Sequence, residues 1–298
     1  MVATGRATKW YVVLAFLFPS LLGFMVFVFM PILASCGLAF TNYSGGFTYS
    51  YIGLDNFIRT FTSPSFYNAL WVTVKFILFT VTIQIILGFL FAVFVNQKIL
   101  GRQIYRSIFF LPVVLSSVTA SLIFMLMFHP EKGPVNNILM SLGLPAVPWL
   151  TSPKTALLTI ALVTIWQSFG YYMVLFLSGL QTINPELYES ADIDGATVIQ
   201  KLFYITIPML SPTTFLCIII AIINAFKSFD QIYIMTGGQN GGGPAGSTSV
   251  LVFNIYQDAF TNFKMGYASA EAVILLLIIL VVTVIQYRGQ TKWVNYES

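Results

Sequence analysis

Long apolar stretches separated by shorter polar segments run through the whole chain. A transmembrane helix needs about 20 apolar residues in a row, and six stretches are long enough. They are Tyr11–Ala39, Ala69–Val95, Ser107–Phe128, Thr155–Leu177, Thr213–Met235 and Tyr267–Tyr287. The pattern therefore predicts an all-α, polytopic membrane protein with about six transmembrane helices.

The composition agrees with this prediction. Only 8% of the 298 residues are charged and 57% are hydrophobic, whereas a soluble domain has about 25% charged residues. The net charge of +4 is therefore attributed to basic residues that set the orientation of the membrane loops. No nucleic acid is expected as a partner. The first apolar stretch runs for about 28 residues, longer than the core of a signal peptide, and predicts an uncleaved first helix.

The basic residues predict the orientation, because cytoplasmic loops carry an excess of Lys and Arg. With the N-terminus inside, eight basic residues are cytoplasmic: Arg6, Lys9, Lys98, Arg102, Arg106, Lys201, Arg288 and Lys292. Four lie outside: Arg59, Lys132, Lys154 and Lys264. The bias predicts that both termini are cytoplasmic.

One polar segment, residues 181–211, holds four of the ten acidic residues. Asn184-Pro185-Glu186 is typical of a helix start, because Asn can cap free N–H groups and Pro suits the first helical position. A first short helix is predicted from about Pro185 to Asp194. Gly195 then provides a sharp turn, and a second helix, Ala196–Ile207, is predicted to stop at Pro208. Such a helix–turn–helix is either a docking element for a soluble partner or an ordinary loop.

Two apolar stretches carry polar residues with helical spacing. In the fourth these are Thr164, Gln167, Ser168 and Tyr171, and in the fifth Asn224, Lys227, Ser228 and Gln231. The spacing i, i+3, i+4, i+7 places each set on one helix face. Polar residues inside a membrane line a cavity or hold helices together. Amides, hydroxyls and nearby aromatic rings would suit a sugar; interhelical packing is the alternative.

Other polar positions favour structural roles. Lys227 could pair with Asp230 three residues later, or lie in a solute path. Gln84 and the group Ser116, Ser117 and Thr119 are expected to be helix contacts.

The sequence offers few residues suited to catalysis or to metal binding. His129 is the only histidine, so neither a metal site nor acid–base catalysis is expected, and the chain is predicted not to be an enzyme. A secondary transporter would need coupling carboxylates inside the membrane, whereas Asp230 and Glu271 lie near the ends of their stretches. A secondary transporter is therefore a less favoured interpretation than a subunit of a larger transporter.

The acidic segment resembles the cytoplasmic motif of binding-protein-dependent ABC-transporter permeases. That motif reads E-A-A, three residues, G, nine residues, then I-x-L-P. Here it is Glu189-Ser190-Ala191, then Gly195, then Ile205-Thr206-Ile207-Pro208. Ser190 and Ile207 depart from the motif, both conservatively. Gly53-Leu54-Asp55-Asn56-Phe57 and the stretch from Thr236 to Gly238 look like the carbohydrate branch of that family.

The resemblance implies a permease subunit of an ATP-driven importer in a bacterial or archaeal cell (inner) membrane. Its expected partners are two cytoplasmic ATP-binding subunits, a second and paralogous permease, and an extracytoplasmic solute-binding protein. No cofactor is expected in this chain, because ATP and Mg²⁺ would bind to the ATPase subunits. The motif's Glu189 would pair with the ATPase and Gly195 would make the turn. The segment expected to couple to the ATPase includes Glu189, Ser190, Ala191, Asp194, Gly195, Ala196 and Pro208.

The resemblance also raises the solute-path interpretation, because maltose-type permeases contact sugar from the two helices that flank this loop. The residues expected to bind substrate are Thr164, Gln167, Ser168, Tyr171 and Asn224. A sugar or oligosaccharide is the first choice and glycerol 3-phosphate the alternative; the apolar stretches contain no Arg and only two Lys, and a phosphate would want more. The expected domains are 1–67 (first helix and outer loop), 68–288 (core permease, with the coupling loop at about 181–211) and 289–298 (cytoplasmic tail).

Overall fold

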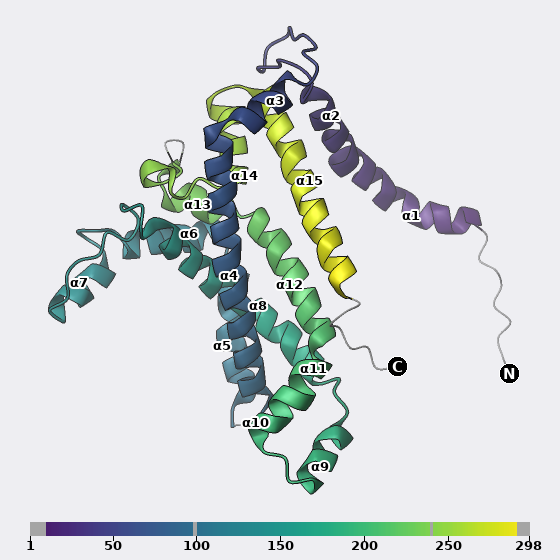
Figure 1. Ribbon diagram of the computed structural model, residues 1–298, viewed down its shortest axis with the longest axis vertical. Coiled ribbons are helices and arrows are strands. Elements are labelled where there is room, and N and C mark those ends of the chain that lie inside the picture. The colour runs from purple at the N-terminus through teal and green to yellow at the C-terminus, as the bar shows by residue number, and fades with distance from the viewer. Residues whose placement is uncertain (1–9, 98–99, 239–240, 291–298) are drawn as a thin grey trace. The chain divides into compact units, whose positions relative to one another are not determined.

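The chain is built from helices, as the apolar pattern predicts. The computed structural model describes residues 10–97, 100–238 and 241–290. Four helical stretches in this part are long and apolar enough to cross a membrane, and two bent helix pairs bring the total to six if each pair is one span. The four are Trp10–Leu38, α4 (Pro64–Asn96), α8 (Ala156–Leu180) and α15 (Met265–Gln290). Figure 1 shows these elements in chain order.

The chain folds as two compact units. The first consists of Met1–Thr62 with Asp258–Ile274, and the second of Ser63–Gln257 with Leu275–Ser298. Some predictions fall outside the described residues: the basic residues Arg6, Lys9, Lys98 and Lys292, and most of the tail 289–298.

The first unit contains one long apolar helix, followed by a short helix that side-chain hydrogen bonds hold in place. The helix comprises α1 (Trp10–Phe24), the π-helical turn η1 (Met25–Phe29) and α2 (Met30–Leu38). Its side chains are not buried within the described chain. After it, Asn56 on α3 (Asp55–Thr62) donates to the carbonyls of Ala39 and Thr41, at 2.9 and 2.8 Å. The unit also includes η5 (Gln257–Thr261) and the first part of α15.

The second unit has a core formed by α4 and α8. Buried apolar side chains of both helices, including Phe76 and Ile160, pack with Ile232 and Phe253 from later elements. Helix α5 (Arg102–Val114) packs on α8 at Gly170, where a Cβ atom would lie 2.1 Å from the carbonyl oxygen of Phe109. Only glycine permits this approach. The remaining short elements are α7 (Pro134–Ser141), η4 (Pro244–Gly246) and α14 (Leu251–Tyr256).

The third predicted span is bent, so the prediction of one continuous helix over Ser107–Phe128 is wrong. Helices α5 and α6 (Ser117–Met127) meet at 94°. Leu115 and Ser116 between them have extended backbones, with ψ of 140° and 133°. Pro112 lies inside α5 and lacks the N–H of a helical hydrogen bond. The bend leaves polar backbone groups to be satisfied by other parts of the chain.

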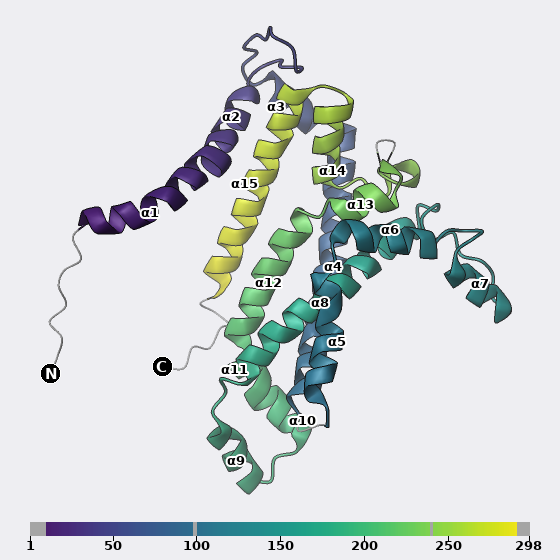
Figure 2. The same ribbon diagram turned by 180° about the vertical axis from the view of Figure 1, so that it is seen from behind.

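The fifth predicted span is also interrupted. Helix α12 (Ser211–Phe226) ends before Lys227, and α13 (Asp230–Met235) begins three residues later. The prediction that Asn224, Lys227, Ser228 and Gln231 share one face of a single helix is therefore wrong. Phe229, with φ of −126°, lies at the break. Figure 2 shows α12 and α13 as separate helices.

The coupling loop forms the predicted helix–turn–helix, with shifted ends. Its first helix, α9 (Pro185–Ile193), is capped by the Asn184 side chain, which accepts a hydrogen bond from the Glu186 N–H. The second begins at Val198, not Ala196, because Thr197 and Gln200 form a capping box. It comprises α10 (Val198–Lys201), η2 (Leu202–Thr206) and α11 (Ile207–Met209).

The prediction that the second helix stops at Pro208 is wrong. The helix continues to Met209 and then meets α12 at 64°. Pro208 follows the π-helical turn η2, in which the Ile207 N–H bonds to the Leu202 carbonyl. The wider π turn removes the regular i−4 geometry that a proline ring would disrupt.

Candidate substrate cavity and coupling loop

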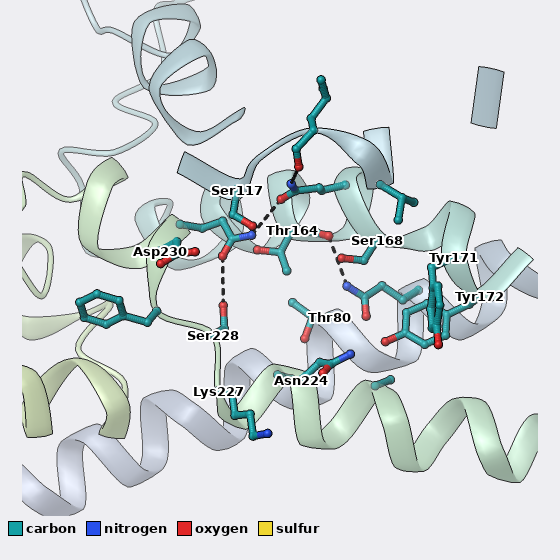
Figure 3. A pocket seen from close by; sticks show the side chains of 18 residues that line it. Thr80, Ser117, Thr164, Ser168, Tyr171, Tyr172, Asn224, Lys227, Ser228 and Asp230 are labelled. Carbon is teal, nitrogen blue, oxygen red and sulfur yellow. Dashed lines mark hydrogen bonds between the residues drawn. The ribbon is translucent and has the colours of Figure 1, made fainter. Parts of the chain in front are cut away.

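A cavity of about 450 Å³ lies where α4, α8 and the two helix breaks meet. Its volume is in the usual range for small-molecule sites. Figure 3 shows its polar side chains converging from several elements. The lining residues are Thr80, Gln84, Val113, Leu115, Ser117, Thr164, Gln167, Ser168, Tyr171, Tyr172, Ala221, Asn224, Ala225, Lys227, Ser228, Phe229, Asp230 and Gln231.

All five residues predicted to bind substrate line this cavity: Thr164, Gln167, Ser168, Tyr171 and Asn224. The first four come from one face of α8, and Asn224 comes from the last turn of α12. The geometry brings them together; that they bind a solute stays a prediction.

A chain of hydrogen bonds ties the two helix breaks to α8. Gln167 Nε2 donates to the carbonyl oxygen of Leu115 at 2.9 Å, in the break between α5 and α6. Gln231 Nε2 donates to Gln167 Oε1, also at 2.9 Å. Ser228 Oγ donates to Gln231 Oε1 at 3.4 Å, in the break between α12 and α13. Gln167 and Gln231 are buried, so this network positions the cavity walls.

Of the five predicted residues, Ser168, Tyr171 and Asn224 are more accessible to a ligand than the buried Thr164 and Gln167. The side chains of Ser168, Tyr171 and Asn224 reach the cavity at the points labelled in Figure 3. The ring of Tyr171 packs edge-on against that of Tyr172, with centroids 5.4 Å apart, and the phenol of Tyr172 interacts with Asn224. By contrast, the hydroxyl of Thr164 donates to the Ile160 carbonyl at 2.9 Å.

Lys227 and Asp230 both line the cavity, and both are exposed to it. The helix break removes the i, i+3 geometry, and the two side chains point in different directions (Figure 3). The suggested pair is therefore absent: neither residue forms a salt bridge within the described part of the chain. A cation and an anion are thus each available to a ligand.

Sequence reasoning assigned some lining residues to helix contacts or did not single them out. Gln84 and Ser117 line the cavity, as does Thr80. Gln84 Nε2 also donates to the Thr164 carbonyl at 3.4 Å, so it is a helix contact as well. Thr80 and Gln84 are spaced i, i+4 on α4, which could have indicated a polar face. Ser117 could not be found this way, because it depends on the bend after Leu115.

Side-chain contacts join the two helices of the coupling loop across its turn. Gly195 has φ of +74°, a conformation that favours glycine. Lys201 Nζ forms a salt bridge with Asp192 Oδ1 at 2.6 Å, and the hydroxyls of Tyr188 and Thr206 lie 3.0 Å apart. These contacts join α9 to the second helix across the turn.

The outer surface of α9 is exposed. Glu189 and Ser190 are exposed, and Ile193 is 88% exposed. Beside the turn, a hollow of about 300 Å³ is lined by Ala191, Asp194, Gly195, Ala196, Gln200, Lys201, Tyr204 and Ile205. Most of the predicted coupling residues thus lie close together, whereas Pro208 lies in α11, at the far end of the loop.

A cavity lined by polar side chains, in a chain whose helices are long and apolar enough to cross a membrane, is compatible with a membrane transport component. Residues 84–292 match the family described as "Binding-protein-dependent transport system inner membrane component". The chain belongs to this family, which confirms the resemblance of its motif.

Similar proteins extend over nearly the whole chain. The arabinooligosaccharides transport system permease protein AraP of Bacillus subtilis (strain 168) is 35% identical over 272 residues, 91% of this chain and 85% of AraP. The sn-glycerol-3-phosphate transport system permease protein UgpA of Agrobacterium fabrum is 33% identical, covering 84% of each. A crystal structure of a bacterial ABC transporter involved in the import of the acidic polysaccharide alginate has a TM-score of 0.79 at 26% identity, covering 93% of this chain and 96% of that one.

The chain is thus a multi-pass inner membrane permease subunit of an ABC importer. It is a transport component rather than an enzyme, and its family works with a binding protein and with ATP hydrolysis.

Proposed function

We propose that this permease carries a neutral sugar or short oligosaccharide, and that its cavity forms half of the translocation path. The single observation that carries the proposal is the lining of the cavity. Ser168, Tyr171 and Asn224 offer a hydroxyl, a phenol and an amide from the two helices that flank the coupling loop. Sugars bind through such hydrogen-bonding groups and through the faces of aromatic rings. AraP, a similar protein, is named for arabinooligosaccharides.

The coupling loop is the proposed docking site for the ATPase. Two ATP-binding subunits, a second permease and an extracytoplasmic binding protein complete the proposed importer. Glu189 would contact the ATPase from the exposed face of α9, and Gly195 would hold the turn. The salt bridge between Asp192 and Lys201 supports this role, because a rigid loop can transmit the closure of the ATPase pair to α8 and α12.

The proposed topology places both termini and the coupling loop in the cytoplasm. The excess of basic residues on that side supports it. The division at residues 67 and 68 into an N-terminal part and a core stays a prediction.

Glycerol 3-phosphate is the second candidate substrate, and Lys227 favours it. Its ammonium group lines the cavity without a salt bridge in the described chain, and UgpA is named for this solute. However, Asp230 lines the same cavity, and no arginine is among its described lining residues. Phosphate sites commonly use Arg or several cations, so the neutral sugar is preferred.

The test is purification of the tagged permease from its native membranes with its partners. The binding protein of the same importer is then loaded in turn with arabino-oligosaccharides, malto-oligosaccharides, simple sugars and glycerol 3-phosphate. We expect an ATPase and a second permease to co-purify, and one sugar class to stimulate ATP hydrolysis. Stimulation by glycerol 3-phosphate alone would overturn the sugar proposal, and purification without an ATPase would overturn the docking proposal.

A further inference from the structure

A second hollow, of about 850 Å³, lies on the outside of the second unit between α4 and α8. It is separate from the substrate cavity, with which it shares no lining residue. We call it the α4–α8 groove. Its lining residues are Asn68, Trp71, Val72, Lys75, Phe76, Leu78, Phe79, Pro153, Lys154, Leu157, Leu158, Ala161, Ala245 and Ser247.

The groove is lined by apolar side chains along most of its length and by polar side chains at one end. Leu78 and Leu158 are largely exposed along it, at 64% and 45%. Both belong to helices long and apolar enough to cross a membrane, so this part of the groove would face hydrocarbon in a membrane. The polar groups gather where α4 and α8 begin: Asn68 lies in the second turn of α4, and Lys154 directly precedes the N-cap of α8.

The polar end carries hydrogen-bonding capacity that the chain itself does not use. Asn68 Nδ2 donates to the Gly246 carbonyl at 3.2 Å, which holds the end of η4 against α4. Beside it, the Ser247 hydroxyl oxygen is buried and has no hydrogen-bond partner in the structure. An unsatisfied buried hydroxyl is costly, and Ser247 is one of the residues that line the groove.

Two lysines give the groove a positive charge. Lys75 lies eleven residues beyond the first residue of α4, about 16 Å along the helix at 1.5 Å per residue. Its ammonium lies over the ring of Trp71, 5.1 Å from the centroid. Neither Lys75 nor Lys154 forms a salt bridge within the residues that the structure describes. A cation at this depth in a membrane calls for a nearby anion.

We propose that the α4–α8 groove binds an anionic phospholipid of the leaflet that meets the beginnings of α4 and α8. Its phosphate would lie between the ammonium groups of Lys75 and Lys154, at the end of the groove that Ser247 also lines. An acyl chain would lie along Leu78, Leu157 and Leu158. The apolar walls distinguish this occupant from free phosphate. The two lysines, which form no salt bridge with the described residues, distinguish it from a purely apolar helix of another subunit.

Native mass spectrometry of the complete importer, purified in mild detergent, tests the headgroup. Phosphatidylglycerol and phosphatidylethanolamine with the same acyl chains are titrated against the native importer and the double variant Lys75→Gln/Lys154→Gln. The matched control is Lys132→Gln/Lys264→Gln, which removes two lysines outside the groove. We expect the groove variant to bind phosphatidylglycerol about tenfold more weakly, and the control to bind it normally. Equal losses in both variants, or equal binding of the two lipids by the native importer, would overturn the proposal.

A second pair of variants tests the acyl chain and the source of the phosphate. Leu158→Trp fills the groove, whereas Leu162→Trp changes an equally exposed residue on the next turn of α8, outside the groove. We expect only Leu158→Trp to displace phosphatidylglycerol, and millimolar inorganic phosphate not to compete. Competition by inorganic phosphate would mean a free-anion site. Cross-linking of Leu78→Cys to a partner subunit, with no bound lipid, would mean that a protein helix covers the groove. Either result would contradict the lipid proposal.

Discussion

Gln167 and Leu115 are joined by a hydrogen bond from the Gln167 Nε2 atom to the Leu115 carbonyl oxygen, 2.9 Å long, across the bend between α5 and α6. This bond gives a partner to a backbone carbonyl in a break between two apolar helices, where water is scarce. Gln167 also accepts a bond from Gln231, next to the second break. One buried side chain on α8 thus links both breaks that surround the cavity.

Gln167→Leu should destabilise the permease through the loss of these two bonds. Interhelical hydrogen bonds in membrane proteins contribute about 0.6 kcal/mol each and up to about 1.7, so we expect a loss of roughly 1–2 kcal/mol. Thermal unfolding of the purified importer measures it. Gln181→Leu, at the exposed C-cap of α8, is the matched control and should change the midpoint little. Because the bonds form one network, Gln231→Leu should add little to Gln167→Leu; full additivity would contradict the network.

Lys227→Gln separates the two candidate substrates. A neutral sugar does not need the ammonium group, so uptake should stay within about threefold of the native rate. A phosphate ligand would lose a charge-assisted hydrogen bond, which contributes about 1.5–3 kcal/mol, or more than tenfold in affinity. Concentration-dependent uptake measures this, with Asp230→Asn as the control of opposite charge. A more than tenfold rise in the half-saturating concentration for Lys227→Gln alone would favour glycerol 3-phosphate.

Glu189→Lys should uncouple ATP hydrolysis from transport. Its carboxylate lies on the exposed face of α9, and a reversed charge there would repel the partner group that it is proposed to contact. We expect uptake to fall at least tenfold while the permease still inserts into the membrane. Glu131→Lys, an exposed charge reversal outside the coupling loop, should leave uptake unchanged. Native uptake and ATPase retention with Glu189→Lys would exclude docking through this residue.

Gly195→Val should weaken ATPase retention through backbone strain alone. A Cβ atom at Gly195 would meet nothing within 4 Å, but φ is +74°. The left-handed conformation costs an ordinary residue about 1–2 kcal/mol, whereas Asn tolerates it better. Retention in a pull-down should therefore fall in the order Gly, Asn, Val. Gly46→Val, also at an open position but without positive φ, is the control; equal retention by Gly195→Val would show that the turn need not keep this shape.

The continuous membrane-spanning helices were predictable, because an uninterrupted apolar stretch of about 20 residues or more rarely forms any other structure. Tyr11–Ala39 corresponds to Trp10–Leu38, and Tyr267–Tyr287 falls within α15. The two bends were not, because Leu115 and Phe229 are themselves apolar and continue the pattern through the break. Pro112 and the polar pair Ser116-Ser117 in one case, and the polar pair Lys227-Ser228 in the other, were the only marks of these places. Hydropathy reports where hydrocarbon surrounds the chain, but not where another helix supplies a hydrogen bond to an interrupted backbone.

The cavity was predictable only in part, because sequence spacing places side chains correctly only along an uninterrupted helix. The polar face of α8 followed from helical spacing, because its helix runs without interruption from Ala156 to Leu180. Asn224 lines the cavity too, from the last turn of α12 before the break. Ser117 and Gln84 reach the cavity only through the packing of α4 and α6 around α8, which spacing within one helix does not report. Likewise, the salt bridge between Asp192 and Lys201 depends on how the chain turns at Gly195.

The central claim is that a sugar passes through the cavity under the control of the ATPase. It is tested most directly by ATP-driven sugar uptake into proteoliposomes containing the complete importer, with native permease or with the double variant Tyr171→Ala/Asn224→Ala. The account predicts that uptake falls at least tenfold while the ATPase and the second permease stay bound. Tyr105→Ala/Asn137→Ala, exposed residues outside the cavity, should transport normally. Undiminished uptake by the Tyr171/Asn224 variant would place the sugar path elsewhere and contradict the account.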